Sequence, residues 1–151
     1  MQIRIMEEKD LDEVTALEAS GFSQPWKRHD FEEILQNPIR TYFVALEQEH
    51  IIGGCLLTEI AGEGEITNVC VKQEFRGQGI ANRLMETLLE YGEKKNLTAF
   101  TLEVRSGNTA AIRLYQHFGF VTEGIRKNFY DKPVEDACIM WKRKINGNDS
   151  N

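Results

Sequence analysis

Apolar positions in the first part of the chain follow a helical spacing, after a short run that is typical of a strand at residues 2–5. Asp10 lies three residues before Glu13, which is the spacing of a capping box at the start of the first helix. Asn37-Pro38 ends a second, shorter helix. The elements expected here are a helix carrying Leu11, Val14 and Leu17 and ending near Gly21, a loop over 22–26 and a helix over 27–36.

The middle of the chain is rich in β-branched and apolar residues and predicts three antiparallel strands. Thr41–Glu47 and Ile51–Ile60 are separated by Gln48-Glu49-His50, so we expect a hairpin with a three-residue loop. Gly62 and Gly64 indicate the next turn, and Glu65–Val71 is the third strand.

Beyond residue 71 helices and strands alternate. Asn108 is a good N-cap and Gly119 a good residue after a helix C-terminus. A meander followed by a β-α-β crossover predicts an α/β (α+β) fold, a mixed sheet with helices on both faces. Glu103 lies on the crossover strand, so we expect it to be covered from both sides. The expected elements are helices 80–95 and 109–118 and strands 98–105, 120–125 and 136–142.

Composition narrows the class of protein. The 151 residues suit one domain, which we place at residues 1–145, with a disordered tail at 146–151. The net charge of −6 argues against binding to nucleic acid or to an anionic membrane. An odd number of cysteines, three, without a CxxC pair predicts reduced thiols, and the start carries no signal-peptide pattern. We therefore expect a cytoplasmic protein, and no metal site, because the three histidines have no ligand spacing.

A glycine-rich turn joins the third strand of the meander to the long helix. Gly77 and Gly79 allow close approach to the main chain, Arg76 adds a positive charge, and the first-turn N–H groups of the helix point outward. Such a turn can hold a pyrophosphate. Asn82 stands where a dinucleotide-binding fingerprint needs its third glycine, and no P-loop lysine follows. A connector without a ligand remains the alternative.

Two separated motifs carry a resemblance to a known family. Arg76-x-x-Gly79-x-Ala81, after Val69-Cys70-Val71, resembles the acetyl-CoA motif of GCN5-related N-acetyltransferases, the GNAT superfamily. The stretch from Leu102-Glu103-Val104-Arg105 through Asn108 to Phe120 is similar to the second half of that pattern. Pro25-Trp26 and the ending around Asn128-Phe129-Tyr130 are similar to the RimI-type branch, which acetylates the N-terminal alanine of a small-subunit ribosomal protein.

The resemblance implies a GNAT-like, mostly antiparallel twisted sheet and acetyl-CoA as co-substrate. Main-chain amides would hold the acetyl and pantetheine parts, the glycine-rich turn would hold the pyrophosphate, and Asn108 would contact the pantetheine arm. It also implies a protein N-terminus as acceptor, and we expect a monomer or a weak dimer. The implied cofactor-binding residues are Val69, Cys70, Val71, Arg76, Gly77, Gln78, Gly79, Ile80, Ala81, Asn82 and Asn108.

Two residues are candidates for acid–base chemistry. Glu103 falls where RimI-type enzymes carry their general base, and a pairing with Arg105 along the strand is the alternative. Tyr115 is the candidate general acid for the leaving thiolate, and a core tyrosine beside Ile112 and Phe118 is the alternative. Direct attack in a ternary complex needs both groups.

The remaining candidates are less specific. Trp26 and Tyr130 either form the walls of the acceptor pocket or pack the edge of the core. Cys70 is better explained as a small apolar residue than as a nucleophile, since no histidine lies nearby in the sequence. The alternative functions are an acetyltransferase for a small amine or a lysine, and a coenzyme-A-binding module without catalysis.

Overall fold

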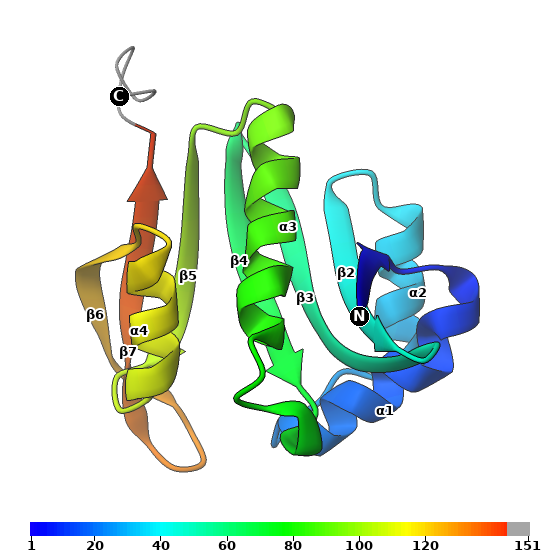
Figure 1. The fold of residues 1–151 in the computed structure, drawn as a ribbon. Coiled ribbons are helices and arrows are strands. Elements are labelled where there is room, and N and C mark those ends of the chain that lie inside the picture. Colours follow the sequence, from blue (N-terminus) through cyan, green and yellow to red (C-terminus); the bar gives the residue numbers. More distant parts are fainter. Residues whose placement is uncertain (145–151) are drawn as a thin grey trace.

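The computed structural model describes residues 1–144, which form one seven-stranded sheet with the strand order β1-β2-β3-β4-β5-β7-β6 (Figure 1). Only β4 and β5 are parallel, and the other five neighbouring pairs are antiparallel. The mixed, mostly antiparallel sheet expected from the sequence is therefore confirmed. The strands are β1 Gln2–Ile5, β2 Arg40–Glu47, β3 His50–Ile60, β4 Glu63–Val71, β5 Ala99–Arg105, β6 Val121–Tyr130 and β7 Glu135–Arg143.

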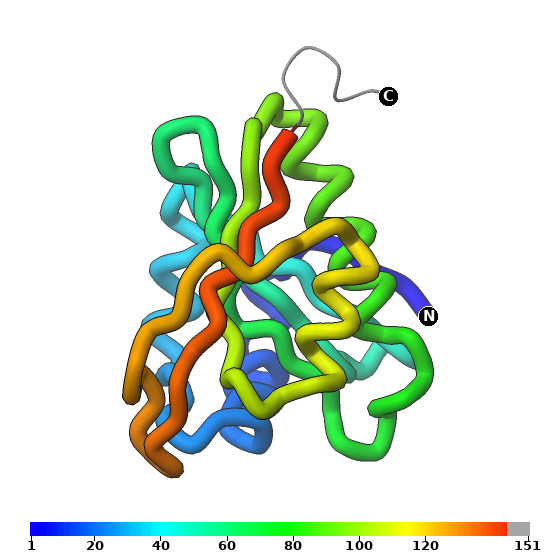
Figure 2. Tube along the Cα trace, turned by 90° about the vertical axis from the view of Figure 1, so that its left-hand side faces the viewer, coloured from blue at the N-terminus to red at the C-terminus, as the bar shows by residue number. Residues whose placement is uncertain are grey.

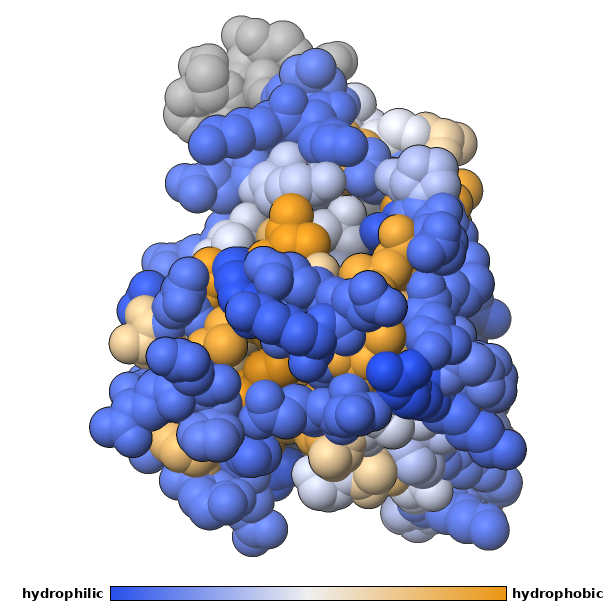
Figure 3. Space-filling model, turned by 90° about the vertical axis from the view of Figure 1, so that its right-hand side faces the viewer, coloured by the Kyte–Doolittle hydropathy of each residue, from blue (hydrophilic) through white to orange (hydrophobic). Residues whose placement is uncertain are grey.

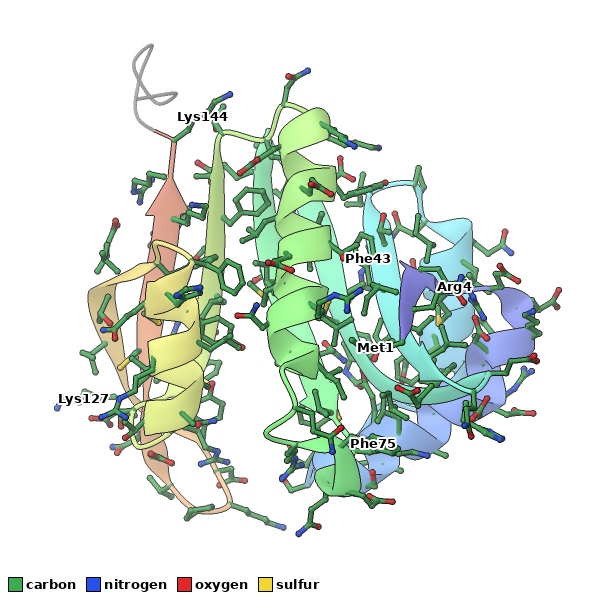
Figure 4. The ribbon with its side chains drawn as sticks, viewed as in Figure 1. Met1, Arg4, Phe43, Phe75, Lys127 and Lys144 are labelled. Carbon is green, nitrogen blue, oxygen red and sulfur yellow. The ribbon has the colours of Figure 1, made fainter. Side chains whose placement is uncertain are left out.

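Helices cover both faces of the sheet, as expected. One core joins α3 and α4 to the sheet, and Phe43 of β2 meets Tyr91 of α3 there edge to face, with ring centroids 5.3 Å apart (Figure 4). The other core joins α1 and α2 to the opposite side of β2 and β3 through residues such as Tyr42 and Val44. The helices are α1 Leu11–Gly21, α2 Arg28–Gln36, α3 Ile80–Lys94 and α4 Thr109–His117.

The first helix does not begin with the predicted capping box. Asp10 ends a short 3₁₀ turn, and its carboxylate accepts hydrogen bonds from the Arg4 guanidinium at 2.7 and 3.0 Å and from the Glu7 N–H at 2.7 Å. Glu13 accepts instead from the Ile51 N–H at 3.2 Å. Asp10 is thus the third residue of a capping box that begins at Glu7, and the ion pair with Arg4 of β1 occupies its carboxylate as well.

Several strand boundaries also differ from expectation. The β2–β3 loop has two residues, Gln48 and Glu49, both with positive φ (51° and 68°), which suits a tight hairpin turn. Gly64 lies inside β4, where a Cβ would come within 2.9 Å of the Phe100 ring. β6 extends to Tyr130, five residues further than predicted, because its largely exposed side chains carry no apolar alternation.

The sheet is not covered evenly. Figure 2, viewed from the β6–β7 edge, shows these two strands crossing with twist and their connecting turn extending to the lower end of the molecule. The side of β5 that carries Thr101, Glu103 and Arg105 is only half-buried. The expectation that Glu103 would be covered from both sides is therefore wrong, since α1 and α2 pack against the β2–β4 part of the sheet.

The surface on the β1 side is mainly hydrophilic, with apolar side chains visible between charged ones (Figure 3). Within residues 1–144, none of the helices is both long and apolar enough to cross a membrane. The tail expected to be disordered, residues 146–151, lies outside the described residues.

Candidate active site

The parallel strands β4 and β5 separate after a short stretch of pairing. They are in register only at Gly64 with Phe100 and at Glu65 with Thr101 (Figure 1). Beyond these pairs the edge of β4 that faces β5 carries main-chain N–H and C=O groups that no strand within residues 1–144 pairs with. An extended ligand can bind to such an edge as a further strand would.

The glycine-rich turn lies at the same end, where α3 begins. Gly77 and Gly79 have φ values of 79° and 80°, and no atom lies within 4 Å of a Cβ built at either position. Gly79 is the N-cap of α3, so no side chain caps the first-turn N–H groups. Arg76 is exposed, and its Nε donates to the Val71 carbonyl at 3.1 Å. The turn therefore presents outward-facing main-chain donors beside a guanidinium, as an anion site requires.

A side chain from the preceding turn holds this segment against the core. Phe75 belongs to the 3₁₀ turn Gln73–Phe75 between β4 and α3, at the lower end in Figure 4, and packs partly buried on the core beneath α3. Ile80 is buried below the turn, while Ala81 and Asn82 are partly exposed. The exposed positions Gln78 and Gly79 therefore stand on a fixed base.

A β-bulge lies in β4 next to the predicted acetyl-binding residues. Cys70 pairs with Gly54 and Thr67 with Leu56, so Asn68 and Val69 together stand opposite Cys55. Asn68 has φ 58°, in the left-handed region. A bulge of this kind bends its strand and changes the direction of the residues that follow. Cys70 and Val71 then pair with Gly54 and Gly53 of β3, so the last residues of β4 stay in the sheet beyond the bulge at Asn68.

Asn108 caps α4 as predicted. Its Oδ1 accepts from the Ala111 N–H at 3.1 Å. The residue is exposed at the end of β5, and α4 begins at the same end of the sheet as α3 (Figure 1). Its predicted contact with a pantetheine arm stays a prediction, and its side-chain oxygen already holds the helix N-terminus.

Glu103 forms an ion pair, but not with Arg105. Arg126 of β6 donates its Nε to Glu103 Oε2, with the Glu103 side chain 29% exposed. Arg105 instead pairs with Glu135 at 3.2 Å and stacks over the Tyr130 ring at 4.4 Å. The predicted alternative partner of Glu103 was therefore wrong, and the carboxylate remains accessible from the half-buried side of β5.

Tyr115 lies on the opposite side of β5 from Glu103. Its side chain belongs to the core that contains Leu102 and Val104, and its ring meets Phe120 at 6.0 Å. Burial raises the pKa of Tyr115, so the phenol stays protonated at neutral pH. Among residues 1–144 its hydroxyl has no hydrogen-bond partner. Buried tyrosine hydroxyls usually find a partner, so this donor is available to a ligand.

The two predicted acceptor-wall residues lie in different surroundings. Tyr130 is half-buried between β6 and β7, and burial followed by the charge of Glu103 raises its pKa. Trp26 packs against Phe31 at 5.6 Å, with the Arg40 guanidinium 5.3 Å from its ring centre. Tyr130 is therefore next to Glu103, whereas the contacts of Trp26 are with the α2 core.

The three cysteines are buried free thiols. Burial is the main cause that raises the pKa of Cys70 to about 11, and its Sγ lies 3.8 Å from the Leu17 carbonyl oxygen. A thiol held protonated is a poor nucleophile, in keeping with the apolar role expected for Cys70. Within residues 1–144 no three or more histidine, cysteine or acidic side chains gather as metal ligands would.

A separate groove of about 500 Å³ lies between α3 and the α4 end. Its lining includes Glu86, Glu90, Phe118 and Lys142 and none of the predicted site residues. The groove is open, so the separation of β4 and β5 remains the candidate site.

The sequence reasoning missed a buried polar group beside this site. Glu18 of α1 is 1% exposed and is hydrogen-bonded to Tyr42 of β2 and Asn68 of β4. Two signals in the sequence indicate it: a glutamate on the apolar stripe of α1, seven residues after Leu11, and an asparagine in the middle of the strand run EITNVCV.

Comparison with known proteins identifies the family. The profile of the Acetyltransferase (GNAT) family matches residues 11–120. A Bacillus subtilis protein provisionally named a ribosomal protein bS18-alanine N-acetyltransferase is 39% identical over 140 residues, which are 92% of this chain and 93% of that protein. The Escherichia coli K12 enzyme with the same activity in its name is 31% identical over 142 residues, with 91% and 94% covered.

Solved structures agree on the fold. The crystal structure of the Escherichia coli ribosomal-protein alanine N-acetyltransferase superposes with a TM-score of 0.86 at 28% identity, covering 94% of this chain and 92% of that one. A Brucella melitensis ribosomal-protein-alanine N-acetyltransferase gives 0.84 at 20% identity, covering 95% and 99%, a likeness of fold alone. These matches show that the chain belongs to the acetyltransferase (GNAT) family and is an acetyl-CoA-dependent N-acetyltransferase.

Proposed function

We propose that this enzyme acetylates the N-terminal alanine of a small-subunit ribosomal protein, by direct attack of the α-amine on acetyl-CoA in a ternary complex. One observation carries the proposal: β4 and β5 separate, and Glu103 and Tyr115 lie on opposite sides of β5 beside that separation. The likeness to relatives that carry this activity in their names supports the choice of acceptor. With such an acceptor, the reaction would take place in the cytoplasm, where ribosomes assemble.

The residues at the start of α3 fit the pyrophosphate of coenzyme A. Gly77, Gly79 and the first-turn N–H groups through Asn82 would donate to its oxygens, and Arg76 would add charge once it leaves the Val71 carbonyl. The free edge of β4 would hold the pantetheine arm, with Asn108 near its other side. Acetyl-CoA supplies an activated acetyl thioester, and no metal is needed in this chemistry.

An α-amine suits the candidate acid–base groups of this site. At pH 7 an α-amino group with a pKa of ~8 costs about 1.4 kcal/mol to deprotonate, whereas a lysine with a pKa of ~10.4 costs about 4.6 kcal/mol. A half-exposed carboxylate is a modest base, so the group that is easier to deprotonate by ~3 kcal/mol is the better match. Glu103 would accept the proton of the amine, directly or through one water.

Glu103 and Tyr115 would then act from opposite sides of β5. The amine would approach from the side of Glu103 and Tyr130, and Trp26 would lie at the edge of that approach. A main-chain N–H within Val69–Val71 would donate to the carbonyl oxygen as negative charge develops there. Tyr115 would donate to the departing sulfur from the opposite side. Because a thiol of pKa ~8.5 is more acidic than a phenol of ~10, we assign Tyr115 a hydrogen-bond donor role at least as much as full proton transfer.

An acceptor panel tests the assignment. The enzyme is incubated with acetyl-CoA and an alanine-starting peptide whose lysines are blocked, the same peptide with its α-amine blocked, a lysine peptide and a set of small amines. Mass spectrometry of the products should find acetyl groups on the free α-amine of the first peptide alone. Acetylation of a small amine or a lysine with no reaction at the alanine terminus would contradict the proposal.

A further inference from the structure

Glu18 makes a buried polar network that the proposed reaction does not use. Its carboxylate is 1% exposed on α1, and both oxygens are occupied. The Tyr42 hydroxyl donates to Oε2 at 2.6 Å, and the Asn68 side-chain amide donates to Oε1 at 2.8 Å. A buried carboxylate is costly to retain in a helix that otherwise contributes apolar residues to the core. The carboxylate of Glu18 therefore links three elements, α1, β2 and β4, by hydrogen bonds.

The fold makes room for this network. Tyr42 is 1% exposed, and a Cβ placed on Gly54 of β3 would come within 2.5 Å of its hydroxyl oxygen. Only glycine therefore lets the phenol pass over β3 to reach Glu18. The second hydrogen-bond donor to the carboxylate is Asn68. This residue lies in the β4 bulge and has a φ of 58°.

The bulge is the point at which the network meets the site. Asn68 and Val69 stand opposite Cys55, in the stretch of β4 that lies beyond its last pair with β5, Glu65 with Thr101. A left-handed conformation is unfavourable for most side chains, and asparagine tolerates it best after glycine. The hydrogen bond from its side chain to Glu18 restrains that conformation further.

We propose that Glu18 is a positioning residue, which through Asn68 fixes the left-handed bulge of β4 and so sets the direction of the Val69–Val71 main chain toward the thioester. This inference rests on the proposed acetyl site but not on the identity of the acceptor. Glu18 touches neither reactant. Its contribution is the alignment of main-chain donors, where a displacement of ~1 Å can lower a rate on the order of 100-fold.

Substitutions at Glu18 separate alignment from stability. Glu18→Gln keeps both hydrogen bonds, because the amide nitrogen can donate to the Tyr42 oxygen while the amide oxygen accepts from Asn68. It should retain kcat within about threefold of the wild type. Glu18→Ala removes both bonds and should lower kcat of the folded enzyme at least about tenfold, with a weaker Kd for acetyl-CoA measured by calorimetry.

Asn68 supplies a second pair of variants. Asn68→Gly keeps the left-handed conformation at no steric penalty, whereas Asn68→Ala loses both the bond and the conformational preference. We expect kcat to fall in the order wild type, Asn68→Gly, Asn68→Ala. If Glu18→Ala does not fold, the two Asn68 variants still show whether the bulge affects kcat.

Asp10→Asn is the matched control. Asp10 is the other buried aspartate or glutamate among the described residues, 4% exposed, and it holds Arg4 at the far end of α1. Its substitution should lower Tm while kcat and the Kd for acetyl-CoA stay at the wild-type values.

Two results would overturn the inference. One is unchanged kcat and Kd in folded Glu18→Ala and Asn68→Ala, with a loss of Tm alone as in Asp10→Asn. The other is an equal loss in Glu18→Gln and Glu18→Ala, which would remove the hydrogen bonds as the cause. Binding of acetyl-CoA needs no acceptor, so a different acceptor in the panel would contradict the proposed function and leave this comparison valid.

Discussion

Arg126 on β6 reaches across β7 to bind the carboxylate of Glu103 on β5. The side chains are 57% and 29% exposed, so the pair contributes at most about 1 kcal/mol and can open without much loss of stability. A base held in this way is available when an acceptor displaces the guanidinium. The pairing also keeps the carboxylate oriented toward the half-buried side of the sheet.

Glu103→Gln should therefore lower kcat by on the order of 100-fold at neutral pH while the Kd for acetyl-CoA stays within about twofold. The amide keeps the shape of the side chain but cannot accept the proton. Steady-state kinetics with an alanine-starting peptide, beside calorimetry with acetyl-CoA, measures both quantities.

Glu123→Gln is the control for that experiment. Glu123 also pairs with an arginine across the β6–β7 part of the sheet, Arg143, at 2.9 Å. Loss of this ion pair in Glu123→Gln should leave kcat unaltered. If kcat/KM of Glu103→Gln matches the wild type across the pH range, Glu103 is not the base.

Tyr115→Phe should slow turnover on the order of 100-fold with an unchanged Tm. The ring keeps its contact with Phe120, and the lost hydroxyl has no partner within residues 1–144. Tyr91→Phe serves as comparison, since Tyr91 packs on the same core and its hydroxyl lies 3.3 Å from Thr41 Oγ1. Equal kinetics in Tyr115→Phe and wild type would count against the donor role.

Gly79→Ala should weaken the binding of acetyl-CoA about tenfold or more and lower stability by roughly 1–2 kcal/mol, because alanine at φ 80° is strained. Gly62→Ala carries the same strain at φ 81°, also with no atom within 4 Å of the new Cβ, but in the distant β3–β4 turn. Calorimetry and urea unfolding should find equal stability losses and a binding loss in Gly79→Ala alone. Equal affinities in the two variants would argue against a pyrophosphate at this turn.

The stability of the enzyme should fall with rising pH because of Glu18. Burial is the main cause that raises its pKa from the usual 4.5 to about 7, while the bonds from Tyr42 and Asn68 act in the opposite direction. Between these values the folded state holds a proton that the unfolded chain has lost, and above pH 7 it must bury a charge. The wild type should lose roughly 3 kcal/mol from pH 4.5 to pH 8 relative to Glu18→Gln. Urea unfolding of both proteins at the two pH values measures this, and parallel curves would contradict it.

Local patterns predicted the elements that rest on local physics. The apolar stripe of α3 and the Asn108 cap of α4 are encoded within a few neighbouring residues, and both were found. The capping box at Asp10 failed because Arg4, from another element, takes its oxygens. The cover over Glu103 and the network of Glu18 depend on which helix packs over which strand, and nothing in the residues next to either glutamate specifies that.

A structure of the enzyme with bound coenzyme A would show directly where the pyrophosphate lies. We expect pyrophosphate oxygens at about 3 Å from main-chain nitrogens between Gly77 and Asn82, with the pantetheine arm along the free edge of β4. A pyrophosphate bound elsewhere, with the start of α3 exposed to solvent, would contradict it.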